Sequence, residues 1–362
     1  MKHVPFVVAA SIPVLLLAGC SVNPLLLPAN SRQSEMFTDE AEPDVPTTPK
    51  AQLAKARQLA WEAAVLVQNP PHPSETWQKA RVKWRRAIHS LESIPEGTPV
   101  STQAKQRLAT YRANYAAIDN RLKTEQKAIS QLEEAQTLAW QAAITVQKPP
   151  RTLAVWQSAD RKWQEAITRL ETIPAMSSVS ARSRQKLADY RRNQMAIQQQ
   201  LALETKAVAT LAAFETTAKY LRNLPTKVAA GQAVGQVGIS YQNYVDRVQT
   251  LKDTLADLAK QPKGTQHATY ADLAEALRDY EFGITVWQAY QEFKRDNAEW
   301  LRGDDSYDQL FPVALIDSQT LTEKYQITTY LDGSKISLKF TLWAIWDRAK
   351  QLVDRAEQGI KT

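Results

Sequence analysis

The sequence predicts an all-α protein made of tandem helical repeats, and two observations lead to this prediction. Glycine is scarce, with 10 residues in 362, while Ala, Gln, Leu, Arg, Lys and Glu, which favour helix, dominate long stretches. Residues 51–128 also align without gaps with residues 130–207, at an offset of 79, and 37 of the 78 aligned pairs are identical. Self-similarity at a fixed period is typical of repeat architectures. We therefore expect three-helix repeats with long shared helices, in a bundle-like or solenoid-like arrangement.

The chain begins with a targeting segment. A short basic start precedes an apolar run from Val4 to Leu17, and Leu17-Ala18-Gly19-Cys20 ends the run. This ending resembles the lipobox of bacterial lipoproteins. The resemblance covers these residues alone, and it implies that residues 1–19 are a cleaved signal peptide and that Cys20 carries the lipid.

Two simpler explanations of this segment fit less well. A transmembrane anchor would need about 20 apolar residues, more than this run holds. An ordinary secretory signal would need a coincidence, because Cys20 is the only cysteine of the chain. We therefore expect a lipid anchor on the extracytoplasmic, periplasmic side of a bacterial membrane. Ser21 favours the outer membrane by a rule that holds in enteric bacteria and transfers poorly to others, so the choice between inner and outer membrane stays open.

Residues 20–49 are predicted to be an extended tether. They hold five prolines and five acidic residues, a composition that cannot build an apolar core.

Prolines separate three predicted helices in each of the two repeats, residues 50–128 and 129–207. In the first repeat a helix ends at Asn69-Pro70-Pro71, and a second helix ends near Ile94-Pro95. No Pro or Gly occurs between Val100 and Gln147, nor between Ser177 and Leu224. The third helix of one repeat should therefore continue into the first helix of the next, over roughly 70 Å. Near-heptad spacing in these stretches favours coiled-coil packing.

Two further regions complete the predicted organisation. Residues 208–300 are expected to be a degenerate third repeat, because Leu277-Arg278-Asp279-Tyr280 resembles Leu187-Ala188-Asp189-Tyr190. Residues 301–362 are expected to form a small, atypical C-terminal cap, which covers apolar surface at the end of a repeat array. Within this cap, Asp332-Gly333 would suit a β-hairpin, but the apolar spacing from Leu338 onward favours a final helix, which we prefer.

Tryptophans recur in both repeats on apolar stripes of helical spacing. We expect them in the core between helices, although a surface that stacks on sugar rings is the alternative. The six residues are Trp61, Trp77, Trp84, Trp140, Trp156 and Trp163.

Positive charge is concentrated in the two repeats. Residues 50–207 hold 25 Lys and Arg against 13 Asp and Glu, a net charge of +12. Such a field favours an anionic partner, and a solvated helix face is the simpler explanation. Nucleic acid suits the charge but not the predicted compartment. The candidate contacts form two clusters: Arg81, Lys83, Arg85 and Arg86, and then Arg182, Arg184, Lys186, Arg191 and Arg192.

Signals of catalysis are absent from the sequence. The histidines are rare and share no metal-ligand spacing, and neither a nucleophile elbow nor a phosphate-binding loop occurs. Asp304, Asp305 and Asp308 lack the spacing and the glycine of a calcium loop. The sequence thus predicts no catalytic residue, no metal site and no cofactor.

The pattern P-P-x5-W-Q-x-A-x-x-K-W-x-x-A-I-x-x-L-E-x-I-P resembles a repeat of uncharacterised cyanobacterial proteins, often lipoproteins or signal-bearing chains. The resemblance covers residues 50–207 and implies no activity and no site residues. A tetratricopeptide repeat fits less well, because its period is about 34 residues and its signature glycine is missing here.

These observations predict a membrane-tethered, non-catalytic scaffold of the cell envelope that binds proteins through its helical repeats. The alternative is a direct binder of envelope polymer, such as peptidoglycan, glycan or anionic wall or lipid groups. An unrecognised hydrolase is the least favoured class, since it would need clustered carboxylates in a cleft.

Overall fold

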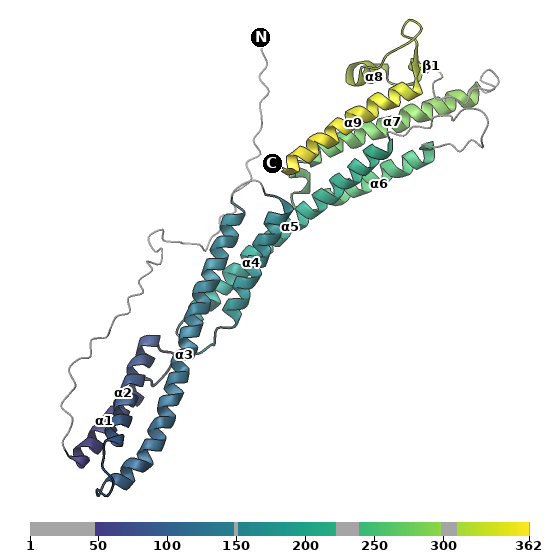
Figure 1. Ribbon diagram of the computed structural model, residues 1–362. Helices are drawn as coiled ribbons and strands as arrows, with labels where there is room; N and C mark the ends of the chain where they lie inside the picture. Colours follow the sequence, from purple (N-terminus) through teal and green to yellow (C-terminus); the bar gives the residue numbers. More distant parts are fainter. Residues whose placement is uncertain (1–47, 148–150, 222–238, 298–309, 362) are drawn as a thin grey trace, which may run out of the picture. The chain divides into compact units, whose positions relative to one another are not determined.

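The predicted all-α class is confirmed. The computed structural model describes residues 48–147, 151–221, 239–297 and 310–361 (Figure 1). The long helices are α1 (Pro49–Leu66), α2 (Ser74–Glu92), α3 (Ser101–Thr145), α4 (Leu153–Glu171), α5 (Ser180–Leu221), α6 (Tyr241–Ala259), α7 (Tyr270–Asp296) and α9 (Leu338–Lys361). The short elements are η1 (Gly264–Gln266), β1 (Leu310–Pro312), η2 (Val313–Leu315), α8 (Ser318–Tyr325) and β2 (Lys335–Ser337).

The two long shared helices are present as predicted. The α3 helix runs for 45 residues and the α5 helix for 42 residues, through the predicted repeat boundaries. Neither helix contains a proline or glycine that would interrupt its hydrogen bonds. The described residues form two compact units, which lie within residues 1–145 with 159–195 and within residues 146–158 with 196–362.

In the first unit, α1, α2 and the first half of α3 enclose one apolar core. Buried alanines on α1 and α2, such as Ala56 and Ala80, let the helices approach closely, and tryptophans fill the remaining space. The ring centre of Trp84 lies 5.1 Å from that of Tyr111 on α3, with the planes at 70°. The equivalent rings of the second repeat, Trp163 and Tyr190, are 5.1 Å apart at 66°. The duplication has therefore kept the same edge-to-face pair between helices.

A glutamate at equivalent positions of the two repeats contacts a turn that precedes a later helix. The glutamate on α3 contacts the turn before α5, and the glutamate on α5 contacts the turn before α7. Glu125, 1% exposed, accepts hydrogen bonds from the Ser177 hydroxyl at 3.1 Å and the Ser178 amide at 3.0 Å, ahead of α5. Its equivalent Glu204 lies 3.3 Å from Nε2 of His267, ahead of α7. The helices α2, α4 and α6 each have 19 residues. These recurrences favour the third repeat, which stays a prediction.

In the second unit, α7 lies alongside both α6 and α9 (Figure 1). The rings of Tyr244, Trp287 and Trp346 meet between these helices, with ring centres 5.5 to 6.5 Å apart. The hydroxyl of Tyr244 donates to the Tyr280 carbonyl at 2.7 Å and accepts from Trp346 Nε1 at 3.1 Å. Both hydrogen bonds are buried, and burial raises the pKa of Tyr244 well above its ordinary value.

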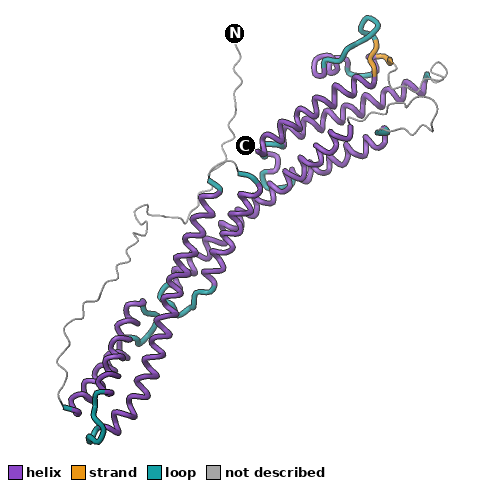
Figure 2. The backbone as a smooth tube through the Cα atoms, in the orientation of Figure 1, coloured by secondary structure: helices purple, strands orange, loops and turns teal. Residues whose placement is uncertain are grey.

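The C-terminal region combines the two structures between which the sequence left a choice. The final helix α9 is present, and in the ambiguous segment, residues 325–340, the preference for helix over a hairpin is confirmed only from Leu338 onward. Before Leu338, β2 pairs antiparallel with β1, with Phe311 opposite Ile336, and a turn at residues 331–334 is closed by a bridge from Tyr330 to Lys335 (Figure 2). The pairing buries Phe311 and Ile336 completely, and the helical spacing begins only after β2, at Leu338.

Gly283 on α7 provides a first test of this packing. A Cβ atom at this position would lie 2.4 Å from the Tyr244 hydroxyl oxygen. Gly283→Ala should therefore displace the ring and break its two buried hydrogen bonds, and we expect it to lower the free energy of unfolding by about 2 kcal/mol. The control is Gly359→Ala on α9, where the new Cβ would make an ordinary 3.8 Å contact. That variant should be neutral or slightly stabilising in the same urea titration, and equal losses in both variants would contradict the packing.

Candidate functional site

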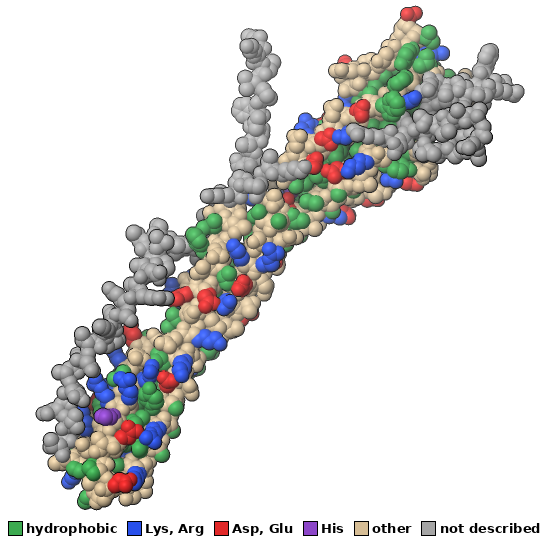
Figure 3. Space-filling view, in the orientation of Figure 1, with side chains coloured by type: hydrophobic (Ala, Val, Ile, Leu, Met, Phe, Trp, Pro, Cys, Tyr) green, Lys and Arg blue, Asp and Glu red, His purple; other side chains and the backbone are tan. Residues whose placement is uncertain are grey.

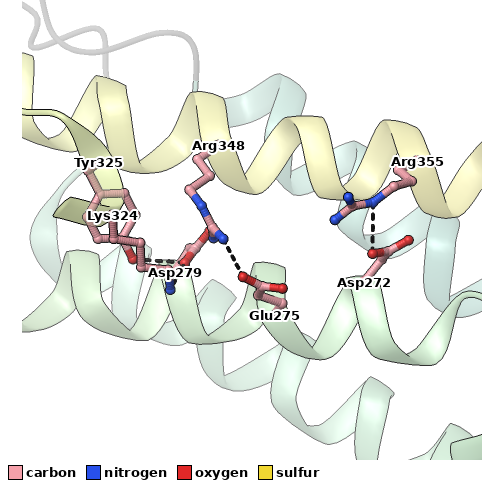
Figure 4. Close-up of polar contacts among 7 residues, drawn as sticks. All are labelled: Asp272, Glu275, Asp279, Lys324, Tyr325, Arg348 and Arg355. Atoms are coloured by element: carbon pink, nitrogen blue, oxygen red, sulfur yellow. Dashed lines mark hydrogen bonds and ion pairs between the residues drawn. The ribbon is translucent and has the colours of Figure 1, made fainter. Parts of the chain in front are cut away.

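A buried carboxylate on α7 is the centre of the densest polar cluster of the second unit. Asp279 is fully buried. Its Oδ1 accepts a hydrogen bond from the Tyr325 hydroxyl at 2.8 Å and forms an ion pair with Lys324 Nζ at 2.7 Å. Its Oδ2 pairs with Arg348 of α9, which also pairs with Glu275 one turn earlier on α7 (Figure 4). The cluster therefore joins α7, α8 and α9 through one charge.

The pKa shifts of Glu275 and Tyr325 have causes typical of a structural ion-pair network. The hydrogen bond from Arg348 lowers the pKa of Glu275 below its ordinary value of 4.5. A carboxyl group whose pKa is lowered in the folded state stabilises the fold at pH values above its ordinary pKa. This contribution is lost as the pH falls from about 4.5 toward the lowered pKa. Burial, with the hydrogen bond to Asp279, raises the pKa of Tyr325. Both oxygens of Asp279 are occupied, so the carboxylate is held as a clamp and not presented to a substrate.

The described residues contain no grouping of His, Cys, Asp and Glu that could hold a metal ion. The three aspartates considered for calcium, at positions 304, 305 and 308, lie outside the described residues. A cavity beside Trp343 and Trp346 measures about 30 Å³, which is room for about one water molecule.

The predicted basic residues differ in whether they have partners within the fold. Five of the nine are engaged within the fold: Arg81 with Asp119, Lys83 with Glu62, Lys186 over the Tyr190 ring, Arg191 with Glu171 and Arg192 with Asp189. The other four, Arg85, Arg86, Arg182 and Arg184, are exposed and form no ion pair with any described residue. On the face drawn in Figure 3, basic and acidic side chains are interspersed rather than gathered in one patch.

Two of the six repeat tryptophans are not in the core, and the prediction for them is wrong. Trp77, Trp84, Trp156 and Trp163 are between 1% and 8% exposed, whereas Trp61 is 67% and Trp140 is 50% exposed. The buried stripe of α1 passes through Ala56, Leu59, Ala60 and Ala63, and Trp61 lies beside this stripe. One residue corresponds to about 100° around a helix, which suffices to turn the indole outward.

Each exposed tryptophan has an exposed β-branched neighbour one turn later. Val65 follows Trp61 and is 41% exposed, and Ile144 follows Trp140 and is 36% exposed. We call Trp61 with Val65 the first outer pair and Trp140 with Ile144 the second outer pair. Both belong to the first unit, on α1 and on the last turns of α3. The identical tryptophans and the matched Val and Ile were visible in the repeat alignment, but only the structure shows that they face solvent.

The Asp279 cluster was not predicted from the sequence. Its only signal was the resemblance between Asp279-Tyr280 and Asp189-Tyr190. Asp189 pairs with Arg192 on the surface of its own helix, so the shared letters occupy different environments. The partners of Asp279 come from 45 to 69 residues further along the chain, a distance at which spacing carries no information.

No protein-family model, curated protein or solved structure matches this chain. None of the helices in the described ranges is long and apolar enough to cross a membrane. The predicted signal peptide, Cys20 and residues 20–47 of the predicted tether lie outside the described residues. The end predicted for the tether, residue 49, is wrong, because Thr48 caps α1 and Pro49 is its first residue.

Proposed function

We propose that the chain is a non-catalytic scaffold of the bacterial cell envelope, held to a membrane through a lipid on Cys20, and that its repeats bind a protein partner. The observation that carries this proposal is the pair of repeat-equivalent, exposed tryptophans Trp61 and Trp140. Tryptophan is among the residues that most often dominate protein interfaces. A duplicated exposed indole without a partner among the described residues therefore supports a binding role.

Divergence between the repeats strengthens this argument. Of the 78 aligned pairs, 41 differ, so retention of an exposed residue calls for a reason. For some retained surface residues, the reason is a contact within the fold. Arg112 pairs with Glu92 at 2.7 Å, and the equivalent Arg191 pairs with Glu171 at 2.7 Å. The indoles of Trp61 and Trp140 have no such contact with any residue of the described ranges, which supports an external partner as the reason.

A second candidate function is direct binding of an anionic envelope polymer through Arg85, Arg86, Arg182 and Arg184. Their exposure without described ion partners favours it. The duplication counts against it, because the second repeat has Gln164 and Glu165 where the first has Arg85 and Arg86. The basic cluster was not kept, whereas the tryptophan was.

Crosslinking in intact membranes, followed by purification of the chain, tests the proposal. A specific envelope protein should be recovered with the wild type, and Trp61→Ala/Trp140→Ala should reduce its yield about tenfold or more, because the variant removes both anchors. The control Gln78→Ala/Gln157→Ala changes two other exposed, repeat-equivalent residues and should leave the yield unchanged. Binding to isolated wall sacculi that is lost in Arg85→Glu/Arg86→Glu, without a co-purified protein, would support the polymer instead.

The lipid anchor has its own test. Cys20→Ala should move the protein from the membrane fraction to the soluble fraction, since several acyl chains on one residue hold a protein firmly to a bilayer. Mass spectrometry of the wild type should find the acyl mass on a peptide that begins at Cys20. An amino-terminal peptide that begins at Cys20 but carries no acyl mass would contradict the anchor.

A further inference from the structure

A tryptophan followed four residues later by a β-branched aliphatic residue occurs four times in the two repeats. Two copies are the outer pairs already defined. The other two are Trp84 with Ile88 on α2 and Trp163 with Ile167 on α4. Residues four apart lie on the same face of a helix, one turn from each other, so each copy presents one combined apolar ridge.

The two inner copies show what this ridge does in the molecule. Trp84 is 5% exposed and packs edge-to-face against Tyr111 of α3, and Trp163 is 1% exposed and packs in the same way against Tyr190 of α5. In both cases the ridge covers an aromatic residue on the neighbouring helix. The combination is thus a helix-packing element within this fold.

The outer pairs have a tryptophan and a β-branched residue at the same spacing, but both residues are exposed. Trp61 is 67% and Val65 41% exposed, and Trp140 and Ile144 are 50% and 36% exposed. The charged residues near Trp61 on α1 are not kept in the second repeat. Arg57 is replaced by Gln136, and Glu62, which pairs with Lys83, is replaced by Gln141. What both copies keep is uncharged and apolar.

We propose that each outer pair is the docking site for an amphipathic α-helix of another protein. The apolar face of that helix is uncharged and carries an aromatic residue, which packs against the exposed tryptophan as Tyr111 packs against Trp84 and Tyr190 against Trp163. This inference rests on the proposed function and names the chemistry of its partner. Because two equivalent sites lie on one unit, the partner presents two such helices or binds in two copies. Linked sites gain affinity from effective concentration, so two modest contacts suffice for stable attachment.

A second copy of this chain is a poorer occupant. Complete burial of both outer pairs would remove roughly 400 Å² of surface, given 150–250 Å² for a whole aromatic side chain. A stable specific interface buries about 800 Å² on each partner. The net charge of +12 on residues 50–207 would also repel an identical surface. The charge objection does not apply to a different protein.

Site-specific photocrosslinking in the full-length, membrane-bound protein tests the inference. A benzophenone amino acid is placed at position 61 or 140, and the crosslinked partner peptide is identified by mass spectrometry. Control proteins carry it at position 78 or 157, where exposed Gln78 and Gln157 occupy equivalent places on α2 and α4. We expect the same envelope protein from positions 61 and 140, at about ten times the control yield or more, through a segment whose apolar residues recur every three to four positions.

Three results would overturn the inference. They are equal yields from all four positions, attachment to a second copy of this chain, and attachment to a partner segment without helical spacing. In the first and third cases a protein partner is still found, so the proposed scaffold function would survive. If no protein is crosslinked from any of the four positions, both the inference and the proposed function fail.

Discussion

Asp279→Ala is expected to lower the free energy of unfolding of the second unit by about 3 kcal/mol. The substitution removes an acceptor that Tyr325, Lys324 and Arg348 share, and it leaves their donors and charges in a half-buried site. Loss of one partner of a buried ion pair costs about 3–5 kcal/mol, and partial solvent access of the two cations places this site at the lower end. Urea unfolding followed by helical circular dichroism measures the change.

Two companion variants keep this prediction informative. Asp279→Asn preserves the volume and one acceptor, so it should be less destabilising and should fold even if the alanine variant does not. Asp272→Ala removes the pair with Arg355, which lies on the same two helices at 2.9 Å but is more exposed, with the Arg355 side chain 61% and the Asp272 side chain 23% exposed (Figure 4). Its loss should cost less than about 1 kcal/mol. A cost for Asp279→Ala no larger than that for Asp272→Ala would mean that the buried carboxylate does not clamp α8 and α9 to α7.

Trp163→Ala is expected to be the most destabilising substitution in the first unit, at about 3–5 kcal/mol. The indole is 1% exposed and fills the space between α4 and α5 against Tyr190, so its removal leaves a large apolar cavity. Urea unfolding of the full-length chain measures the loss.

Trp140→Ala is the matched control for this substitution. It deletes the same side chain from a half-exposed position and should change stability by no more than about 0.5 kcal/mol. If the two variants were equally destabilised, the division of the tryptophans into inner and outer sets would be wrong.

The sequence was sufficient for the helices and for part of the core. The absence of Pro and Gly between Val100 and Gln147 predicted the continuous α3, because helix propagation needs only uninterrupted hydrogen bonding. Trp84 and Trp163 were placed correctly, since they lie on the apolar stripes of their helices. Trp61 and Trp140 were misplaced because hydrophobic character was given more weight than angular position on the helix.

The candidate sites depended on information that helical periodicity does not carry. Asp279 acquires its partners through the packing of α8 and α9, and no local pattern encodes a contact with Arg348 across 69 residues. The strands β1 and β2 have three residues each, too few to show an alternating pattern. Their pairing is a tertiary contact, which is why the final helix was predicted and the strand before it was not.

Oxidative footprinting of tryptophans, in the purified protein and in intact membranes, tests the central claim most directly. The claim is that the two outer indoles face solvent in the isolated chain and are covered by a partner in the envelope. Trp61 and Trp140 should be oxidised rapidly in the purified protein and protected in membranes, while Trp84 and Trp163 should be protected in both. Equal reactivity of Trp61 and Trp140 in membranes and in solution would contradict the account.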